Sequence, residues 1–373
     1  MWLRRLEADR LRNLRAVDLE LSPGLTLLQG RNGQGKTSLL EAVYLLGTAR
    51  SFRSRRIEEL IPWDGGTLRV KGQLDSILGA ADLGFWMDDS GRRLAVNDAD
   101  KEFDQFIGRL AVVDLSGDRI RLLREGPEER RRFLDRGVLG TDNSYLHRLG
   151  DYRKILLQRN ALLRGHGRSG GSAGQLDAWD QQLVEAGEIV HGARRAYAGR
   201  LATAIGDGGR MLFPDGQTLR LRYRPSPALP DSEESPNFKA IFTEKLEQAR
   251  ARDFEVGHTS VGPHRDEMRI HLDEIDLRKF GSAGQLRASL IVLKLGKMAL
   301  LKKDRGEDPL FLMDDFDSDI DDVRAAALVE FLQGSGYQAL VATSKEGLAG
   351  KLGERVREIQ RIRIEDGHAS PLT

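Results

Sequence analysis

The stretch Gly30-Arg31-Asn32-Gly33-Gln34-Gly35-Lys36-Thr37 decides the fold class, because it matches the pattern G-x-x-x-x-G-K-[ST] in full. It follows an apolar segment, residues 25–28, that predicts a strand, and it precedes residues 37–46, which predict a helix. Glycines let backbone N–H groups curl round a phosphate, and the start of the helix adds positive potential there. The alternative is a glycine-rich turn that binds nothing, but eight consistent positions in this context favour a nucleoside triphosphate site.

Two side chains of this loop have separate tasks. The ammonium group of Lys36 would bridge the outer phosphates, and the hydroxyl of Thr37 is the natural ligand for Mg²⁺. A nucleoside triphosphate and Mg²⁺ are therefore the predicted cofactors, and the nucleotide would be ATP in an ATPase of the ABC class. The residues predicted to bind the nucleotide in this loop are Gly30, Arg31, Asn32, Gly33, Gln34, Gly35, Lys36, Thr37 and Ser38.

A second element is the sequence LFLMDD, residues 310–315, an apolar strand that ends in Asp314 and Asp315. A carboxylate at such a strand end can hold Mg²⁺ through water, and its neighbour can orient the water that attacks the phosphate. Taken alone, the pair could equally cap a following helix. Its combination with the phosphate loop favours the catalytic interpretation.

A third element determines the class of nucleoside triphosphatase. The hexapeptide GSAGQL occurs twice, at residues 171–176 and 281–286. The first copy lies inside the flexible run GHGRSGGSAG, which favours a linker. The second opens a long apolar helix, so that Ser282, Gly284 and Gln285 would stand at a helix start, where anions bind. Since the phosphate loop already serves its own subunit, the second copy is predicted to cap the γ-phosphate held by another molecule, which is the ABC arrangement.

The rest of the chain predicts an α/β domain that is split in sequence. Short strands and helices fill residues 1–120 and return over residues 255–373, and the two parts would form one ATPase head. Residues 121–254 are rich in arginine and in long helical stretches, and they predict an inserted helical arm.

Composition limits the setting of the protein. The chain has 58 Lys and Arg against 57 Asp and Glu, so any DNA site must come from local clusters of arginine. The absence of cysteine excludes disulfides and Cys-ligated metals and fits a reducing compartment. No apolar stretch is long enough to span a bilayer, and the N-terminus has no apolar signal core. We therefore expect a cytoplasmic protein with no membrane partner.

Several stretches outside the generic motifs resemble the RecF family of bacterial recombination mediators, which is related to the SMC and Rad50 ATPases. These stretches are LLEAVYLLGTARSFRS, GPEERRRFLD, YRKILLQRNALLR, WDQQLVEAGEIV, TSVGPHRDEM and DDFDSDID. The similarity extends over nearly the whole chain. It implies an ABC-type head of mixed sheets flanked by helices, with a short helical arm. It also implies an ATP-dependent homodimer, slow ATP hydrolysis, binding to double-stranded DNA near single-strand/duplex junctions, and work with RecR and RecO.

The resemblance also implies roles for single residues. Asp314 would be the carboxylate on the metal side, and Asp315 would be the catalytic base, a position that many other ABC ATPases fill with glutamate. Ser282, Gly284 and Gln285 would act on the partner's nucleotide. Ser318 and Asp321 would belong to the D-loop, which touches the partner's phosphate loop.

The chain departs from the family pattern in two places. Ser116-Gly117-Asp118 stands where the family often has a Pro-Glu pair, so no Q-loop residue is assigned. Thr343 and Ser344 stand where ABC transporters carry a switch histidine, which leaves the γ-phosphate sensor unassigned and disfavours a transporter subunit.

Three questions stay open at the level of sequence. His264, in the run GPHR, could take part in chemistry or could simply bond backbone within a turn. The arginines within residues 50–56 and 119–136 could contact DNA or could form solvated helix faces. The activity itself could be that of a DNA-binding clamp, or of a nucleotide-switched scaffold or defence protein that has no junction-specific DNA binding.

Overall fold

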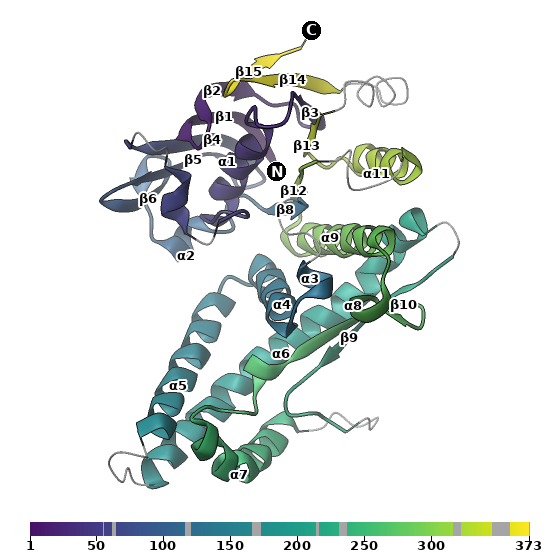
Figure 1. Cartoon of the computed structure of the whole chain (residues 1–373). Helices are drawn as coiled ribbons and strands as arrows, with labels where there is room; N and C mark the ends of the chain where they lie inside the picture. Colours follow the sequence, from purple (N-terminus) through teal and green to yellow (C-terminus); the bar gives the residue numbers. More distant parts are fainter. Residues whose placement is uncertain are drawn as a thin grey trace. The chain divides into compact units, whose positions relative to one another are not determined.

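The computed structural model describes residues 1–54, 56–61, 65–115, 121–165, 173–213, 216–230, 237–315, 322–344 and 359–372 (Figure 1). The chain forms two compact units. We call Met1–Ile120, Ala204–Thr218 and Ser282–Thr373 the head unit. The arm unit is Arg121–Thr203 with Leu219–Gly281.

The head unit contains two six-stranded sheets with their helices. Its strands are β1 (Trp2–Leu11), β2 (Leu14–Glu20), β3 (Leu25–Gln29), β4 (Leu68–Ser76), β5 (Gly79–Asp88), β6 (Gly91–Val96), β7 (Ala99–Asp100), β8 (Val112–Leu115), β12 (Leu310–Met313), β13 (Ala339–Thr343), β14 (Gln360–Glu365) and β15 (His368–Pro371). Its helices are α1 (Lys36–Thr48), the 3₁₀ turn η1 (Ile57–Leu60), α2 (Phe103–Phe106), α9 (Ala283–Arg305) and α11 (Asp322–Ser335).

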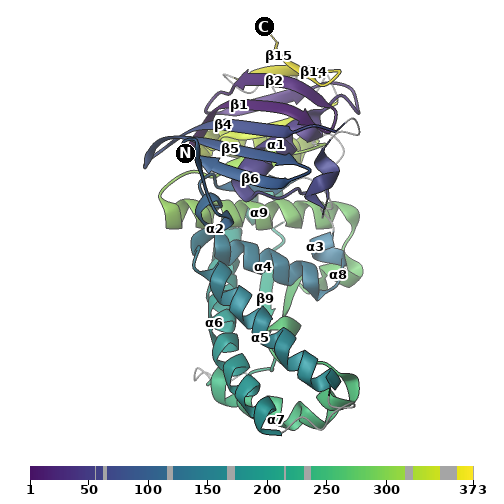
Figure 2. The ribbon, with the colours of Figure 1, turned by 90° about the vertical axis from the view of Figure 1, so that its left-hand side faces the viewer.

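The first sheet is antiparallel, in the order β2-β1-β4-β5-β6-β7, and Figure 2 shows its strands side by side with α1 behind them. Its strands alternate between buried and exposed residues, as the sequence predicts for a sheet with one covered face. A hairpin turn joins β5 to β6, where Asp88 lies opposite Gly91.

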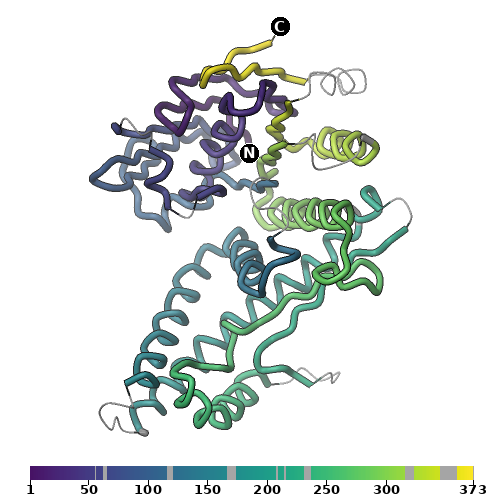
Figure 3. Tube along the Cα trace, viewed as in Figure 1, coloured from purple at the N-terminus to yellow at the C-terminus, as the bar shows by residue number. Residues whose placement is uncertain are grey.

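The second sheet is parallel apart from its last hairpin, in the order β15-β14-β3-β13-β12-β8. It therefore brings the first strands of the chain beside the last ones, as the purple and yellow segments of Figure 3 show. α1 is buried along nearly its whole length and shares one hydrophobic core with residues of both sheets. A helix with apolar residues on most of its sides is buried in this way. The expectation of an α/β fold is confirmed.

The arm unit combines long helices with a three-stranded sheet. Its elements are α3 (Arg121–Arg124), α4 (Pro127–Thr141), α5 (Tyr145–Gly165), α6 (Ala173–Leu212, whose last residues belong to the head unit), β9 (Leu219–Arg224), α7 (Phe238–Val256), η2 (Pro263–Arg265), β10 (Glu267–Leu272), β11 (Ile275–Asp276) and α8 (Leu277–Phe280). The second segment of this unit continues to Gly281. The physical reason is strand pairing: β10 lies antiparallel to β9 along its whole length.

Buried ion pairs hold the arm helices together. The fully buried guanidinium of Arg159 in α5 lies 2.5 Å from Asp180 of α6 and 2.8 Å from Asp253 of α7. Arg194 of α6 pairs in the same way with Asp135 and Asp266, at 2.8 Å each. Buried charges are tolerated when they are paired and hydrogen-bonded in this manner. None of the helices in the described part of the chain has the length and hydrophobicity that crossing a membrane requires.

Candidate nucleotide-binding site

The loop between β3 and α1 has the backbone that a phosphate-binding loop needs. Gly33 and Gly35 have φ angles of 83° and 118°, in the left-handed region that favours glycine. A Cβ atom on Gly30 would lie 2.2 Å from the carbonyl oxygen of Ile364, so β14 leaves no room for a side chain there. α1 begins at Lys36, with Gly35 as its N-cap residue. The free N–H groups of a helix start therefore adjoin the loop, as anion binding requires.

The parallel sheet brings the two predicted catalytic segments together. β3 pairs with β13, and β13 pairs with β12, so their carboxyl ends lie at one edge. At this edge the Thr37 hydroxyl donates to Oδ2 of Asp314 at 2.9 Å, and Asp314 is buried. The Nζ atom of Lys36 lies 2.6 Å from the carbonyl oxygen of Gly30 and 2.9 Å from that of Arg31. Residues far apart in sequence thus converge on the phosphate loop.

The facing oxygens of Thr37 and Asp314 fit Mg²⁺, which prefers hydroxyl and carboxylate ligands and keeps water and phosphate oxygens in its remaining positions. Among the described residues there is no cluster of three or more His, Cys, Asp or Glu that could hold a metal by itself. A larger cluster is not required beside Thr37 and Asp314, because Mg²⁺ at phosphate sites is bound by one or two protein ligands together with the substrate.

Asp315 has an unusual backbone. Its φ angle is 47°, in the left-handed region that side-chain-bearing residues rarely adopt, and its side chain is exposed. The Asp315 amide donates to Oδ1 of Asp314 at 3.1 Å, which fixes the turn. Backbone strain of this kind concentrates at functional sites. Asp315 is exposed, while Asp314 stays buried beside Thr37.

Ser282 is the N-cap residue of α9. Its Oγ atom accepts from the backbone N–H of Gln285 at 3.2 Å, and Oε1 of Gln285 accepts from the backbone N–H of Ser282 at 2.9 Å. This capping box gives the second GSAGQL copy a local structural role. Ser282 and Gly284 are exposed nonetheless, and nothing lies within 4 Å of a Cβ atom built on Gly284. The helix start is therefore open to another molecule.

Some predicted positions lie outside the described residues: Ser318 and Asp321 of the expected D-loop, Ser116-Gly117-Asp118, and Gly171 and Ser172 of the first hexapeptide copy. Thr343 is described. It lies at the end of β13, where it is buried and opposite Gln29.

Residues outside the sequence motif surround the loop, and none of them was predicted. Asn13 follows β1 and bonds Gly33 and Ser38. Asp366 and Gly367, in the last hairpin, bond Gln34. No spacing in the sequence could have indicated them, because they come from opposite ends of the chain.

His264 belongs to the arm unit, whereas the residues of the nucleotide motifs belong to the head unit. Its Nε2 lies 3.0 Å from the carbonyl oxygen of Thr259 and must donate to it, so Nδ1 accepts from the Tyr152 hydroxyl at 2.7 Å. Burial lowers the pKa of His264 to about 4, which leaves the imidazole neutral near pH 7. This arrangement favours the structural interpretation of the GPHR turn.

Seven arginines of the arginine-rich segments fall into two groups. Arg130 forms a buried bidentate pair with Glu267, Arg131 donates to the carbonyl oxygen of Asp266, and Arg132 pairs with Glu128 and Glu129. These three arginines serve the arm unit itself. The second group consists of exposed residues for which the described part of the chain shows no ion pair: Arg53, Arg56, Arg124 and Arg136.

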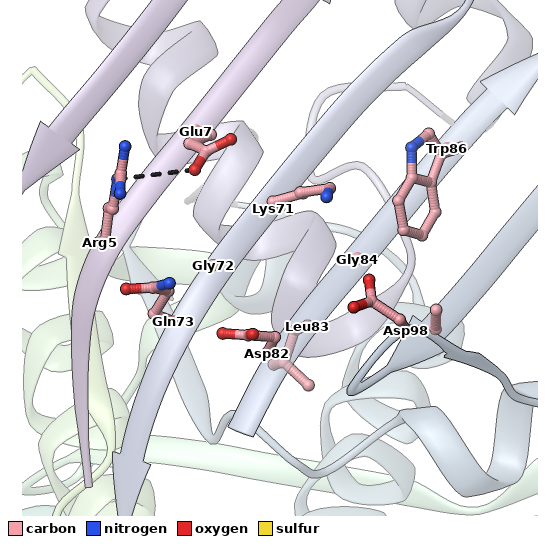
Figure 4. A pocket seen from close by; sticks show the side chains of 11 residues that line it. Arg5, Glu7, Lys71, Gly72, Gln73, Asp82, Leu83, Gly84, Trp86 and Asp98 are labelled. Carbon is pink, nitrogen blue, oxygen red and sulfur yellow. Dashed lines mark ion pairs between the residues drawn. The ribbon is translucent and has the colours of Figure 1, made fainter. Parts of the chain in front are cut away.

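A pocket of about 120 Å³ lies on the open face of the antiparallel sheet and contains none of the predicted site residues (Figure 4). The ring of Trp86 covers Gly84 there, with the Arg93 guanidinium 4.8 Å and the Lys71 ammonium 5.9 Å from its centre. Arg5 pairs with Glu7 and Asp18 on the same sheet. The Arg5–Asp18 and Arg93–Trp86 pairs join neighbouring strands and stabilise this exposed sheet face.

The chain is similar to known proteins of one family. A family described as the RecF/RecN/SMC N-terminal domain matches residues 2–100. The chain is 32% identical to the DNA replication and repair protein RecF of Geobacter sulfurreducens, over 99% of this chain and 97% of that protein. It is 34% identical to the RecF protein of Moorella thermoacetica, over 93% of this chain and 90% of that protein.

Solved structures give the same result. A structure of the recombination mediator protein RecF with ATP, from the RecFOR pathway, superposes with a TM-score of 0.89 at 29% identity, over 100% of this chain and 98% of that one. An SMC head bound to a domain of ScpA, at 15% identity and a TM-score of 0.57, shares the fold alone. With identity above 30% over nearly its full length, the chain belongs to the RecF family of DNA replication and repair proteins.

Proposed function

We propose that this chain is an ATP-dependent DNA clamp of recombinational repair. Two copies would close head to head around two ATP molecules, hold DNA near single-strand/duplex junctions, and release it on slow hydrolysis. The observation that carries the proposal is the 2.9 Å contact between Thr37 and Asp314, which unites the phosphate loop with the strand-end carboxylates. The similar RecF protein whose structure was solved with ATP supports ATP as the nucleotide.

Each residue of the site has a proposed task in hydrolysis. The loop from Gly30 to Gly35, with Lys36 and Ser38, would hold the phosphates, and Mg²⁺ on Thr37 and Asp314 would neutralise charge on them. Asp315 would accept a proton from the attacking water, which then adds to the γ-phosphorus as the bond to ADP breaks. Its exposed side chain, beside the buried Asp314, supports this assignment.

The second half of the site would come from the partner molecule. Ser282, Gly284 and Gln285 make no hydrogen bond to the phosphate loop in the described part of their own chain, although they stand at an exposed helix start. A helix start of this kind suits the γ-phosphate of a nucleotide bound by a second copy. Ser318 and Asp321 are proposed to contact the partner as well.

DNA, RecR and RecO are the proposed partners, and the cytoplasm is the proposed compartment. The exposed arginines Arg53, Arg56, Arg124 and Arg136 are suited to DNA phosphates, because their charges are not used in described ion pairs. RecR and RecO are proposed because the similar RecF structures are described as belonging to the RecFOR pathway.

The direct test is the molecular mass in solution with and without ATP and a gapped DNA duplex. We expect a monomer mass without ATP, twice that mass with ATP, and a further increase with gapped DNA. Doubling with ATP but no response to DNA would favour the scaffold or defence function. Failure to double at all would exclude the clamp.

Ser282→Arg tests the action in trans. The variant should bind ATP normally, because its own phosphate loop is untouched. ATP-dependent dimerisation should weaken by about tenfold or more, as expected when a hydrogen bond to a charged group is lost and a bulky cation is added. Sedimentation with ATP measures the dimer.

Two control variants accompany it. Asn237→Arg removes a comparable helix cap from α7 in the arm unit, where the Asn237 side chain accepts from the N–H of Ala240, and it should leave the dimer unchanged. Ser172→Arg alters the first copy of the hexapeptide, outside the described residues, and should also have no effect. Equal losses in Ser282→Arg and Ser172→Arg would overturn the assignment of the two copies.

A further inference from the structure

Two hairpin turns from opposite ends of the chain contact Gly33 and Gln34, which we call the crest of the phosphate loop. One joins β1 to β2 and contains Asn13, and the other joins β14 to β15 and contains Asp366 and Gly367. The two turns also contact each other, because the Arg15 amide donates to the carbonyl oxygen of Gly367 at 3.1 Å. The crest is therefore held between residues that lie outside the sequence motif.

Asn13 bonds the loop at two points. Its Nδ2 donates to the carbonyl oxygen of Gly33 at 2.6 Å, and its Oδ1 accepts from the hydroxyl of Ser38 at 2.7 Å. One side chain thus links the crest of the loop to the first turn of α1. Asn13 is exposed, so these bonds do not satisfy a buried group of its own.

The second turn holds Gln34 by both its backbone and its side chain. The Gly367 amide donates to the carbonyl oxygen of Gln34 at 3.1 Å, and the Asp366 amide donates to its Oε1 at 2.5 Å. Gly367 has a φ angle of 78°, and a Cβ atom there would lie 2.1 Å from the carbonyl oxygen of Asn13. Only glycine lets the two turns meet in this way.

These contacts determine where the amides of the loop point. In a trans peptide the C=O and N–H bonds point in opposite directions. The carbonyl groups of Gly33 and Gln34 are turned outward to Asn13 and Gly367, so the N–H groups of Gln34 and Gly35 are turned inward. The Gln34 amide donates across the loop to the carbonyl oxygen of Arg31 at 3.4 Å. Successive inward N–H groups form the concavity that binds a phosphate.

We infer that Asn13 and Gly367 are positioning residues for nucleotide binding, which hold the phosphate loop in its binding conformation before the nucleotide arrives. Neither needs to touch the nucleotide. A loop that is fixed in advance loses less conformational freedom on binding, and this raises affinity. The inference concerns the nucleotide site and does not depend on DNA binding or dimerisation.

The first test is Asn13→Ala, with the dissociation constants for ATP and ADP measured by calorimetry. Loss of two hydrogen bonds should raise both constants by about tenfold. The two nucleotides should respond alike, because both carry the phosphates that the loop holds. The hydrolysis rate at saturating ATP should change far less than the affinity, and the midpoint of thermal unfolding without nucleotide should stay close to that of the unchanged protein.

Asn97→Gly is the matched control. Asn97 has a left-handed backbone, and its side chain accepts from the Asp82 amide at 2.8 Å, far from the loop in sequence. Glycine removes that bond without strain, and ATP affinity should not change. Unchanged ATP affinity in Asn13→Ala, or equal losses in both variants, would overturn the inference.

Two further variants test the route of the effect. Gly367→Ala should also weaken ATP and ADP binding, because it forces the turns apart without altering any residue of the loop. In Ser38→Ala, adding Asn13→Ala should cost less affinity than it does in the unchanged protein, since one of its two bonds is already gone. Strictly additive losses would mean that Asn13 does not act through Ser38.

Discussion

Replacing Asp315 by asparagine is expected to slow ATP hydrolysis by about a hundredfold or more, the range in which general bases contribute. The ATP-bound dimer should still form, because Lys36, Thr37, Asp314 and Ser282 are unchanged. It should then persist and hold DNA more tightly than the unchanged protein does. Hydrolysis assays together with sedimentation and gel shifts in the presence of ATP measure the two effects separately.

The physical reason is that the substitution changes one property. An amide keeps the shape of the side chain but cannot accept the proton of the attacking water. Asparagine also tolerates the left-handed backbone of residue 315, where φ is 47°, so the turn after β12 should be preserved. A loss of activity would therefore reflect chemistry rather than a rearranged strand end.

Asp314→Asn is the companion variant. It alters the buried carboxylate that accepts from Thr37 at 2.9 Å, so it should weaken Mg²⁺-dependent ATP binding and with it the dimer. The two variants should thus fail at different steps. Rapid hydrolysis by Asp315→Asn, or its failure to dimerise, would assign the base to another residue.

The affinity of the ATP-bound protein for DNA should fall by roughly a thousandfold between about 50 and 200 mM salt, if about six phosphates are contacted. Each neutralised phosphate releases condensed counterions, so the logarithm of affinity falls linearly with the logarithm of salt concentration. Fluorescence anisotropy on a gapped duplex gives the slope. An affinity that is flat over this range would favour the function without DNA.

Charge variants identify the residues that produce the slope. Arg53→Gln combined with Arg56→Gln removes two exposed charges that form no ion pair in the described part of the chain, and the slope should become shallower by about two. Arg132→Gln is the control, since its guanidinium is already paired with Glu128 and Glu129. If Arg132→Gln flattened the slope as much as the double variant, the division of the arginines would be wrong.

The sequence was sufficient to predict the local elements of the site. The phosphate loop, the strand that ends in Asp314 and the helix that starts at Ser282 each depend on neighbours within a few residues. Glycine, short apolar runs and a capping pair act over this short range, so their patterns can be read without tertiary structure. The predicted change from short strands to long helices after residue 120 also rests on a local change of periodicity.

The tertiary structure alone decided which distant segments meet. Asn13 and Gly367 contact the phosphate loop. β10 pairs with β9, so the arm unit extends to Gly281. Arg130 forms an ion pair with Glu267, while Arg53 stays exposed. Side-chain periodicity shows which face of a strand is buried but not which strand lies beside it, and an arginine has the same local pattern whether or not a carboxylate faces it. Hydrogen bonds between turns of two different sheets bring residues 13, 34 and 367 together, and no pattern within a few residues of any of them contains that information.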